Sequence, residues 1–114
     1  MAVGRKKAQL IAKAALEKKA EGVVILDMRG LAGWTDYFVI SSGSSSRQVK
    51  AIADEILEKL NHSKAKKPTV EGYAPGEWIL IDSGDTVAHI FIPEQRSFYD
   101  LERLWGDAPR IKIS

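Results

Sequence analysis

Apolar residues recur with a helical period in the middle of the chain. Between residues 49 and 60 they stand at every third or fourth position, the spacing of one helix face. This stripe consists of Val49, Ile52, Ala53, Ile56, Leu57 and Leu60. Ser45 and Gln48 have the spacing of a capping box, in which side chains satisfy unpaired backbone N–H groups. The pattern therefore predicts a helix that begins near Ser45.

A second helical pattern covers the first part of the chain, from about Arg5 to Ala20. Its apolar stripe consists of Leu10, Ile11, Ala14 and Ala15. Gly22 follows, and glycine is a common stop signal just beyond a helix. We predict that the helix ends before this glycine.

Short β-branched and aromatic runs predict strands at 23–28, 37–41, 77–82 and 86–93, and the β pattern already begins with "TVEGY" at 69–73. The last two runs are joined by Ser-Gly-Asp at 83–85, which predicts a tight hairpin. Side chains alternate between the two faces of a strand. Trp78, Leu80 and Asp82 therefore share one face, and Ile79 and Ile81 share the other.

After Pro93 the helical period returns, and we predict one last amphipathic helix ending at Gly106. Its apolar positions are Phe98, Leu101, Leu104 and Trp105. The tail at 110–114 could pair as an edge strand. The order αββαβββα predicts an α/β (α+β) fold, with a mixed β-sheet flanked by helices in a single domain over residues 1–114.

Composition excludes several classes of protein. The chain has 114 residues, 45% hydrophobic and 28% charged, which is typical of a globular domain. No apolar run approaches the roughly 20 residues that span a bilayer, and the first 22 residues lack the apolar core of a signal peptide. With no cysteine, disulfides, Cys-ligated zinc and thiol catalysis are excluded. We expect a cytoplasmic protein.

Charge is distributed unevenly, although the formal net charge is only +2. Residues 1–22 contain six basic and two acidic residues, whereas residues 69–108 contain eight acidic and two basic ones. A surface formed by the acidic part would repel nucleic acid and attract a basic partner. A solvated polar face is the alternative interpretation.

The segment "TDYFVISSGSSSRQV", residues 35–49, has the strand–glycine–helix order of a phosphate-binding loop. A helix N-terminus does attract anions. However, a Walker loop needs a second glycine followed by Lys-Ser or Lys-Thr, and a dinucleotide fold needs three glycines. Gly43 stands alone, which favours a structural turn before a capped helix. A nucleotide-binding site stays the alternative.

Enzymatic and metal chemistry find no support in the predicted elements. A two-metal nucleotidyltransferase site needs a pair of acidic residues at i and i+2 on one strand face, and no strand carries one. His62 and His89 are too few for a zinc site, and no nucleophile elbow occurs. We predict no catalytic residue, no metal and no cofactor.

The basic clusters at 5–7 and 64–67 are candidates for contact with RNA phosphates. No aromatic residues are interleaved with them as base-stacking platforms. A solvated helix end and a flexible connector explain these clusters equally well.

Aromatic residues next to carboxylates mark a candidate protein interface in the second half of the chain. Trp and Tyr dominate the energetics of protein interfaces. We expect Trp78 to be partly exposed because it shares its strand face with Asp82. Packing in the core is the expectation for Phe38, Phe91 and Phe98.

Three blocks of the sequence resemble one known family. They are "TDYFVISSGSSSRQV", "VEGY…EWILIDSGDTVAHIF" and "RSFYDLERLWGDAP", in an order and spacing that cover Val23 to Pro109. The chain resembles the ribosomal silencing factor family, also called Iojap-like proteins. One departure lies in the hairpin, where the family often has Asp-Tyr-Gly-Asp and this chain has a serine at position 83.

The resemblance implies a non-enzymatic role. Members bind the large ribosomal subunit through its fourteenth large-subunit protein, a basic protein at the intersubunit face. They thereby block joining of the small subunit and repress translation under nutrient limitation. The implied fold is a nucleotidyltransferase-like α/β/α sandwich without the catalytic acids, and members are often homodimers when free.

Together, the acidic region and the resemblance place the partner-binding face on the β segment and the last helix. Trp78 is the expected apolar anchor. The proposed polar and neighbouring contacts are Glu71, Asp82, Asp85, His89, Tyr99 and Leu101. The basic segments are candidates for an additional contact with ribosomal RNA.

Overall fold

The computed structural model describes residues 2–61 and 67–113, with the side chains of residues 4–61 and 67–113. Four helices and six strands occur among them. In chain order they are α1 (Ala2–Glu17), β1 (Glu21–Asp27), β2 (Tyr37–Ser42), α2 (Ser46–Asn61), β3 (Thr69–Glu71), β4 (Trp78–Asp82), β5 (Thr86–Phe91), α3 (Pro93–Tyr99), α4 (Leu101–Leu104) and β6 (Arg110–Ile111). No described helix combines the length and the apolar character needed to cross a membrane.

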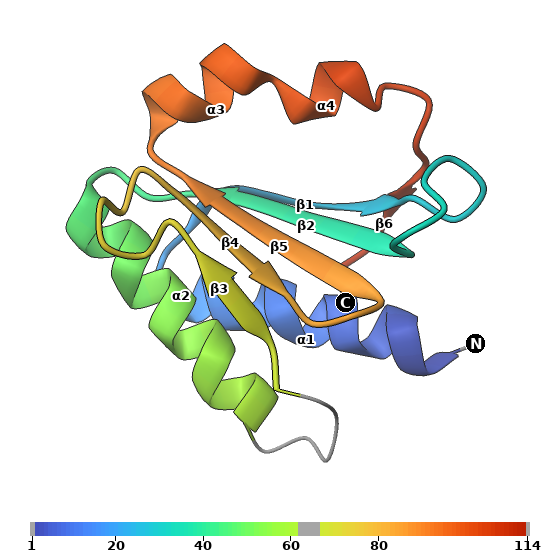
Figure 1. Ribbon diagram of the computed structural model, residues 1–114, viewed down its shortest axis with the longest axis horizontal. Helices are drawn as coiled ribbons and strands as arrows, with labels where there is room; N and C mark the ends of the chain where they lie inside the picture. The colour runs from blue at the N-terminus through green and yellow to red at the C-terminus, as the bar shows by residue number, and fades with distance from the viewer. Residues whose placement is uncertain (1, 62–66, 114) are drawn as a thin grey trace.

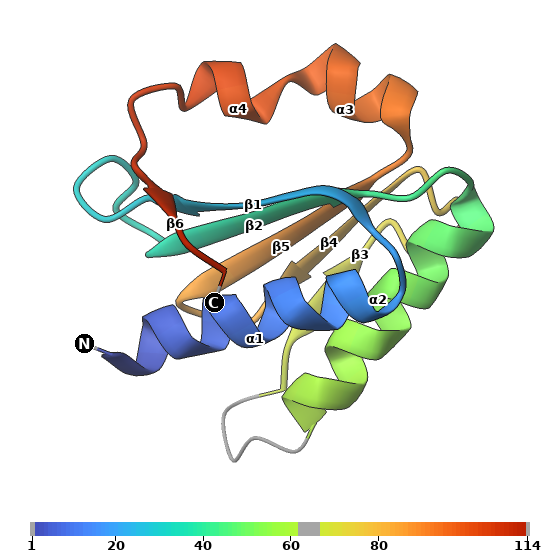
Figure 2. The same ribbon diagram turned by 180° about the vertical axis from the view of Figure 1, so that it is seen from behind.

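One mixed sheet of six strands, in the order β3-β4-β5-β2-β1-β6, forms the centre of the fold. The central strands β2 and β5 are parallel, and every other pair is antiparallel. Helices α1 and α2 lie on one face, and α3 and α4 lie on the other, as both ribbon views show (Figures 1 and 2). The predicted fold class, a mixed sheet flanked by helices, is confirmed, and so is the edge strand in the C-terminal tail.

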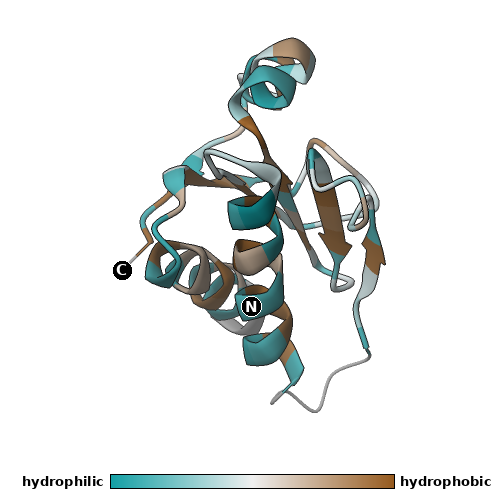
Figure 3. Ribbon diagram, turned by 90° about the vertical axis from the view of Figure 1, so that its left-hand side faces the viewer, coloured by the Kyte–Doolittle hydropathy of each residue, from teal (hydrophilic) through white to brown (hydrophobic). Residues whose placement is uncertain are grey.

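Two hydrophobic cores follow from the alternation of side chains along the strands. The core under α1 and α2 contains Ile79 and Ile81 of β4, and the opposite core contains Phe38 and Phe91 with Trp78 and Leu80 partly buried against it. Figure 3 shows hydrophobic residues concentrated along the strands between the two helical layers. The predicted division of β4 into two faces is therefore confirmed.

Helix α2 buries the stripe that its periodicity predicts: Val49, Ile52, Ala53, Ile56 and Leu60 are buried, and Leu57 is partly buried. Only one of the two hydrogen bonds of the predicted capping box is present. The Ser45 hydroxyl accepts the Gln48 backbone N–H at 3.2 Å, but the Gln48 side chain accepts the N–H of Ser44 instead of Ser45. The same Gln48 amide donates to the carbonyls of Lys18 and Lys19, so it also satisfies the end of α1.

The boundaries of α1 differ from the prediction. The helix begins at Ala2 and ends at Glu17, because Lys19 adopts a left-handed conformation with φ of 62°. Ala20 N–H donates back to the Ala15 carbonyl, which forms a Schellman-type end before Gly22 is reached. Leu10, predicted in the buried stripe, is 39% exposed.

The predicted last helix is wrong in one respect: it is broken into α3 and α4. Asp100 has a left-handed conformation, with φ of 47° and ψ of 55°, and interrupts the helix between them. The break rotates the apolar positions out of one stripe. Phe98, expected in the core, is 78% exposed, and Leu104, another apolar position of the predicted helix, is 69% exposed, while Leu101 and Trp105 pack against the sheet.

The glycine of the segment 35–49 is required for packing. Gly43 is buried, and its N–H donates to the Phe91 carbonyl at 2.9 Å. A Cβ atom at this position would lie 2.9 Å from the backbone nitrogen of Val49, so it would push the first turn of α2 away from the sheet. The N–H groups of Ser44 and Gln48 are already engaged by capping side chains. These contacts favour the structural interpretation of the turn.

We expect Gly43→Ala to lower the free energy of unfolding by about 1–3 kcal/mol, the usual range for overpacking. Urea unfolding followed by circular dichroism measures the change. Gly33→Ala is the matched control, because a Cβ atom at position 33 meets nothing within 4 Å. Equal stability of the two variants would contradict the packing argument.

Candidate partner-binding site

The site is centred on Trp78, the first residue of β4. Its indole lies half-buried between strand and helix: its ring centroid is 5.0 Å from that of Phe91 and 4.5 Å from that of Tyr99. The indole N–H donates to Nδ1 of His89 on the neighbouring strand at 3.1 Å. Trp78 is therefore partly exposed, as predicted, and held in one orientation by its neighbours.

The buried His89 helps to fix the orientation of the Trp78 indole. Only 4% of the residue is exposed, so it acts through Trp78 and does not itself present a surface to a partner. Because burial disfavours the charged imidazolium, the pKa of His89 falls to about 4. A neutral ring with an unprotonated Nδ1 is the form that can accept the Trp78 N–H.

A shallow hollow of about 210 Å³ opens beside the indole, lined by Glu71, Gly72, Trp78 and Leu80; we call it the Trp78 hollow. Glu71 stands opposite Leu80 in the register of β3 and β4, so both side chains belong to the same face of the sheet. Glu71 is exposed and Leu80 is half-buried. The hollow thus combines an aromatic wall, an aliphatic wall and a carboxylate.

Tyr99 and Leu101 flank the site from the helical layer. Tyr99 is exposed and covers part of Trp78, while Leu101 is half-buried in the core below. Phe98 lies against Tyr99 with ring centroids 5.0 Å apart. A row of aromatic rings therefore extends from Trp78 to the exposed outer surface of α3.

Two of the predicted site residues lie elsewhere. Asp82 and Asp85 are at the hairpin end of β4 and β5, and four strand residues correspond to about 13 Å between Trp78 and Asp82. The Asp82 carboxylate accepts the Gly84 N–H and shapes the turn. The Asp85 carboxylate pairs with Lys7 of α1 at 3.0 Å. The structure therefore brings together Glu71, Trp78, His89, Tyr99 and Leu101 but places the two aspartates at the opposite end.

Leu80 and Phe98 were missed as site residues. The signal for Leu80 was available, because it shares the strand face of Trp78 at i+2. The exposure of Phe98 depends on the break at Asp100, which no local periodicity indicates.

The basic candidates for RNA contact are only partly described. Lys7 is engaged with Asp85 and with the Ser83 carbonyl, whereas Arg5 and Lys6 are exposed. Lys67 is exposed, and His62, Lys64 and Lys66 lie outside the described residues.

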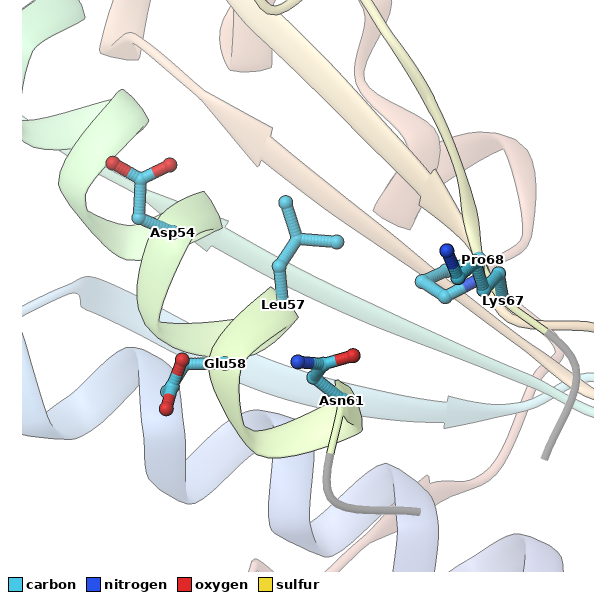
Figure 4. A pocket seen from close by; sticks show the side chains of 6 residues that line it. All are labelled: Asp54, Leu57, Glu58, Asn61, Lys67 and Pro68. Carbon is cyan, nitrogen blue, oxygen red and sulfur yellow. The ribbon is translucent and has the colours of Figure 1, made fainter. Parts of the chain in front are cut away.

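Other parts of the described surface offer less convergent chemistry. The hollow between α2 and the start of β3 is lined by Asp54, Leu57, Glu58, Asn61, Lys67 and Pro68, and its two carboxylates point away from Lys67 (Figure 4). Asp54 accepts a hydrogen bond from the Tyr73 hydroxyl. Within residues 2–61 and 67–113, no three His, Asp or Glu side chains form a group that could hold a metal ion.

Comparison with known proteins identifies the family. The family model described as "Ribosomal silencing factor during starvation" matches residues 3–114. The chain belongs to the ribosomal silencing factor family. The resemblance of the three sequence blocks is thereby confirmed.

Individual relatives of the ribosomal silencing factor family span most of the chain. Proteins named ribosomal silencing factor RsfS from Halalkalibacterium halodurans and Bacillus subtilis are each 43% identical, over 92% and 89% of this chain and 90% and 86% of their own lengths. The chloroplastic protein Iojap of Zea mays is 38% identical over 90% of this chain and 45% of its own length.

Two crystal structures share the fold. A protein from Chromobacterium violaceum superimposes with a TM-score of 0.86 at 34% identity, covering 90% of this chain and 85% of that one. A protein from Bacillus halodurans gives 0.82 at 38% identity, covering 95% and 98%.

The buried histidine predicts how stability depends on pH. The pKa of His89 in the folded protein, about 4, lies below the 6.5 of the unfolded chain. Folding then favours the neutral imidazole. The contribution of His89 to the free energy of unfolding is therefore complete above pH 6.5 and is lost as pH falls toward 4. The loss amounts to about 3 kcal/mol, at roughly 1.4 kcal/mol per pKa unit.

We expect His89→Gln to flatten this acid dependence between pH 6.5 and 4, because glutamine can accept the Trp78 N–H without titrating. Urea unfolding at several pH values measures it, with the wild-type protein as the reference. Parallel pH profiles for the two proteins would contradict the assignment.

Proposed function

We propose that the chain binds the large ribosomal subunit through its fourteenth large-subunit protein and sterically blocks association with the small subunit. Translation would thereby be repressed under nutrient limitation. The observation that carries the proposal is the half-buried Trp78, fixed by His89 and Tyr99 beside the carboxylate of Glu71. Family membership supports the silencing role.

The arrangement around Trp78 has the properties of a protein-binding anchor. Aromatic anchors dominate interface energies when they sit in packed surroundings at the centre of a contact. Because the Trp78 ring is already held by a hydrogen bond to His89 and by ring contacts with His89, Phe91 and Tyr99, binding would cost little side-chain entropy. Exposed Tyr99 and Phe98 extend the apolar area along α3.

Charge favours a basic partner. Glu71 lines the Trp78 hollow and is exposed, and the exposed Glu77 directly precedes Trp78 in the chain. A lysine or arginine side chain of the partner could lay its aliphatic stem on Trp78 and Leu80 and pair its cation with Glu71. Opposite charges on the two surfaces would also raise the association rate.

A steric mechanism demands occupancy and no chemistry. The inhibitor must hold its site more tightly than the small subunit at working concentrations. No catalytic residue is assigned to the chain for this role.

We expect Trp78→Ala and Glu71→Arg each to weaken binding to isolated large subunits about thirtyfold or more, the effect of losing a hot-spot residue. Co-sedimentation through a sucrose cushion measures binding, and subunit-joining assays measure the block. Circular dichroism tests whether each variant is folded, and Glu71→Arg is the variant that leaves the core intact.

Glu17→Arg is the matched control, since Glu17 is an exposed acidic residue of α1, on the other side of the sheet. Full binding by both site variants would refute the proposed face. Binding to naked RNA equal to binding to large subunits would instead favour contact by the basic residues, including Arg5 and Lys6.

We also propose that basic residues of α1 add a contact with ribosomal RNA and that the free chain forms a homodimer. The exposed Arg5 and Lys6 support the first proposal. For the second we expect sedimentation equilibrium at micromolar concentration to give twice the monomer mass of 12.6 kDa. A monomer mass across the concentration range would exclude the dimer.

A further inference from the structure

All N–H donors of one arginine are used within the fold. Arg96 of α3 contacts both carboxylate oxygens of Glu102, with Nε–Oε1 2.9 Å and Nη2–Oε2 3.1 Å. Its Nη1 donates to Ser42 Oγ at 2.8 Å and to the Glu21 carbonyl at 3.2 Å, and Nη2 donates to the Gly22 carbonyl at 2.6 Å. These five contacts, which we call the Arg96 network, equal the donor capacity of a guanidinium.

The Arg96 network spans the break between α3 and α4. Arg96 precedes the left-handed Asp100 and Glu102 follows it. A left-handed conformation is unfavourable by about 1–2 kcal/mol for most residues, so a contact across it helps to maintain the break. Hydrogen bonding to Arg96 also lowers the pKa of the Glu102 carboxyl, which keeps the pair charged at neutral pH.

Neither α3 nor α4 is anchored by a fully buried side chain. The helices have seven and four residues, and neither contains a fully buried residue. Helices this short are not stable in isolation. Besides Tyr99 on Trp78, their apolar contacts come from the half-buried Leu101 and Trp105. The Arg96 network is therefore a main connection between this segment and the strands.

The start of β1, at the other end of the Arg96 network, has space and carbonyl groups for the guanidinium. A bulge between Glu21 and Val24 interrupts the pairing of β1 with β2. At this bulge Arg96 donates hydrogen bonds to the carbonyl oxygens of Glu21 and Gly22. A Cβ atom on Gly22 would come within 2.9 Å of Arg96 Nη1. Glycine at position 22 thus leaves room for an arginine that is distant in the sequence.

We propose that Arg96 is a positioning residue for partner binding. It fixes α3 and α4 against the sheet so that Tyr99 stays on Trp78 and Phe98 and Leu104 face outward. This inference rests on the proposed function and adds that the geometry of the binding face is set by a polar network outside the face.

The first test uses the isolated protein. Arg96→Lys keeps the charge but cannot reproduce the bidentate pair with Glu102. We expect amide hydrogen exchange at residues 97–105 to be at least tenfold faster, with unchanged protection in β2 and β5. Glu102→Gln should change exchange in the same direction. Arg103→Lys, an exposed arginine of the same segment, is the matched control. Unchanged exchange in Arg96→Lys would overturn the inference.

The second test separates positioning from plain stabilisation. We expect Arg96→Lys to weaken binding of folded protein to large subunits about tenfold. In a background with Phe98→Ala and Tyr99→Ala, the same change should cause no further loss, because its effect is transmitted through those side chains. A merely stabilising arginine would give no such coupling.

The outcomes are distinguishable. Faster exchange with unchanged binding would overturn the positioning role and leave the proposed function intact. Failure of the wild-type protein to bind large subunits would overturn the proposed function, and with it the role of Arg96 in partner binding. The exchange measurement would then still report whether the network holds α3 and α4.

Discussion

The sheet has two apolar faces, and the helices cover them unequally. Two 16-residue helices, α1 and α2, pack on one face, whereas only the seven residues of α3 and four of α4 lie over the other. An exposed apolar surface in water is unfavourable unless something covers it. The unequal cover leaves Trp78 and Leu80 half-buried at the β4 side of the sheet, and this is where the candidate site lies. Its position thus follows from how short the helices α3 and α4 over this face are.

Local sequence patterns correctly predicted the elements that are specified by residues close to one another in the sequence. The stripe of α2 and the hairpin between β4 and β5 are specified by neighbouring residues, and both are confirmed. The end of α1 and the break at Asp100 depend on left-handed residues other than glycine, which have no strong sequence signal. Contacts between residues distant in the sequence hold both: Gln48 binds the Lys19 carbonyl, and Arg96 binds Ser42 and the carbonyls of Glu21 and Gly22. Periodicity cannot reveal such contacts.

The candidate site could also be predicted only in part from the sequence. The alternation of β4 identified Trp78 as an anchor, because one face of that strand mixes aromatic and acidic side chains. The roles of Asp85 and His89 were not predictable. Asp85 forms an ion pair with Lys7 of α1, and His89 is buried. Residues close in sequence along a hairpin can serve opposite ends of a sheet. Proximity in the sequence therefore overestimated the size of the acidic surface around Trp78.

The same scaffold could serve either catalysis or binding, and the side chains that converge decide between them. At the start of α2, where an enzyme would hold phosphate, Gly43 packs against Val49, and the side chains of Gln48 and Ser45 accept the N–H groups of Ser44 and Gln48. On the far side of the sheet, aromatic rings converge next to a carboxylate with no metal-binding group of acids among the described residues. The N–H groups of Ser44 and Gln48 are engaged within the fold, whereas Glu71, Phe98 and Tyr99 around the Trp78 hollow are exposed. This arrangement is the one that the proposed contact with a protein partner requires.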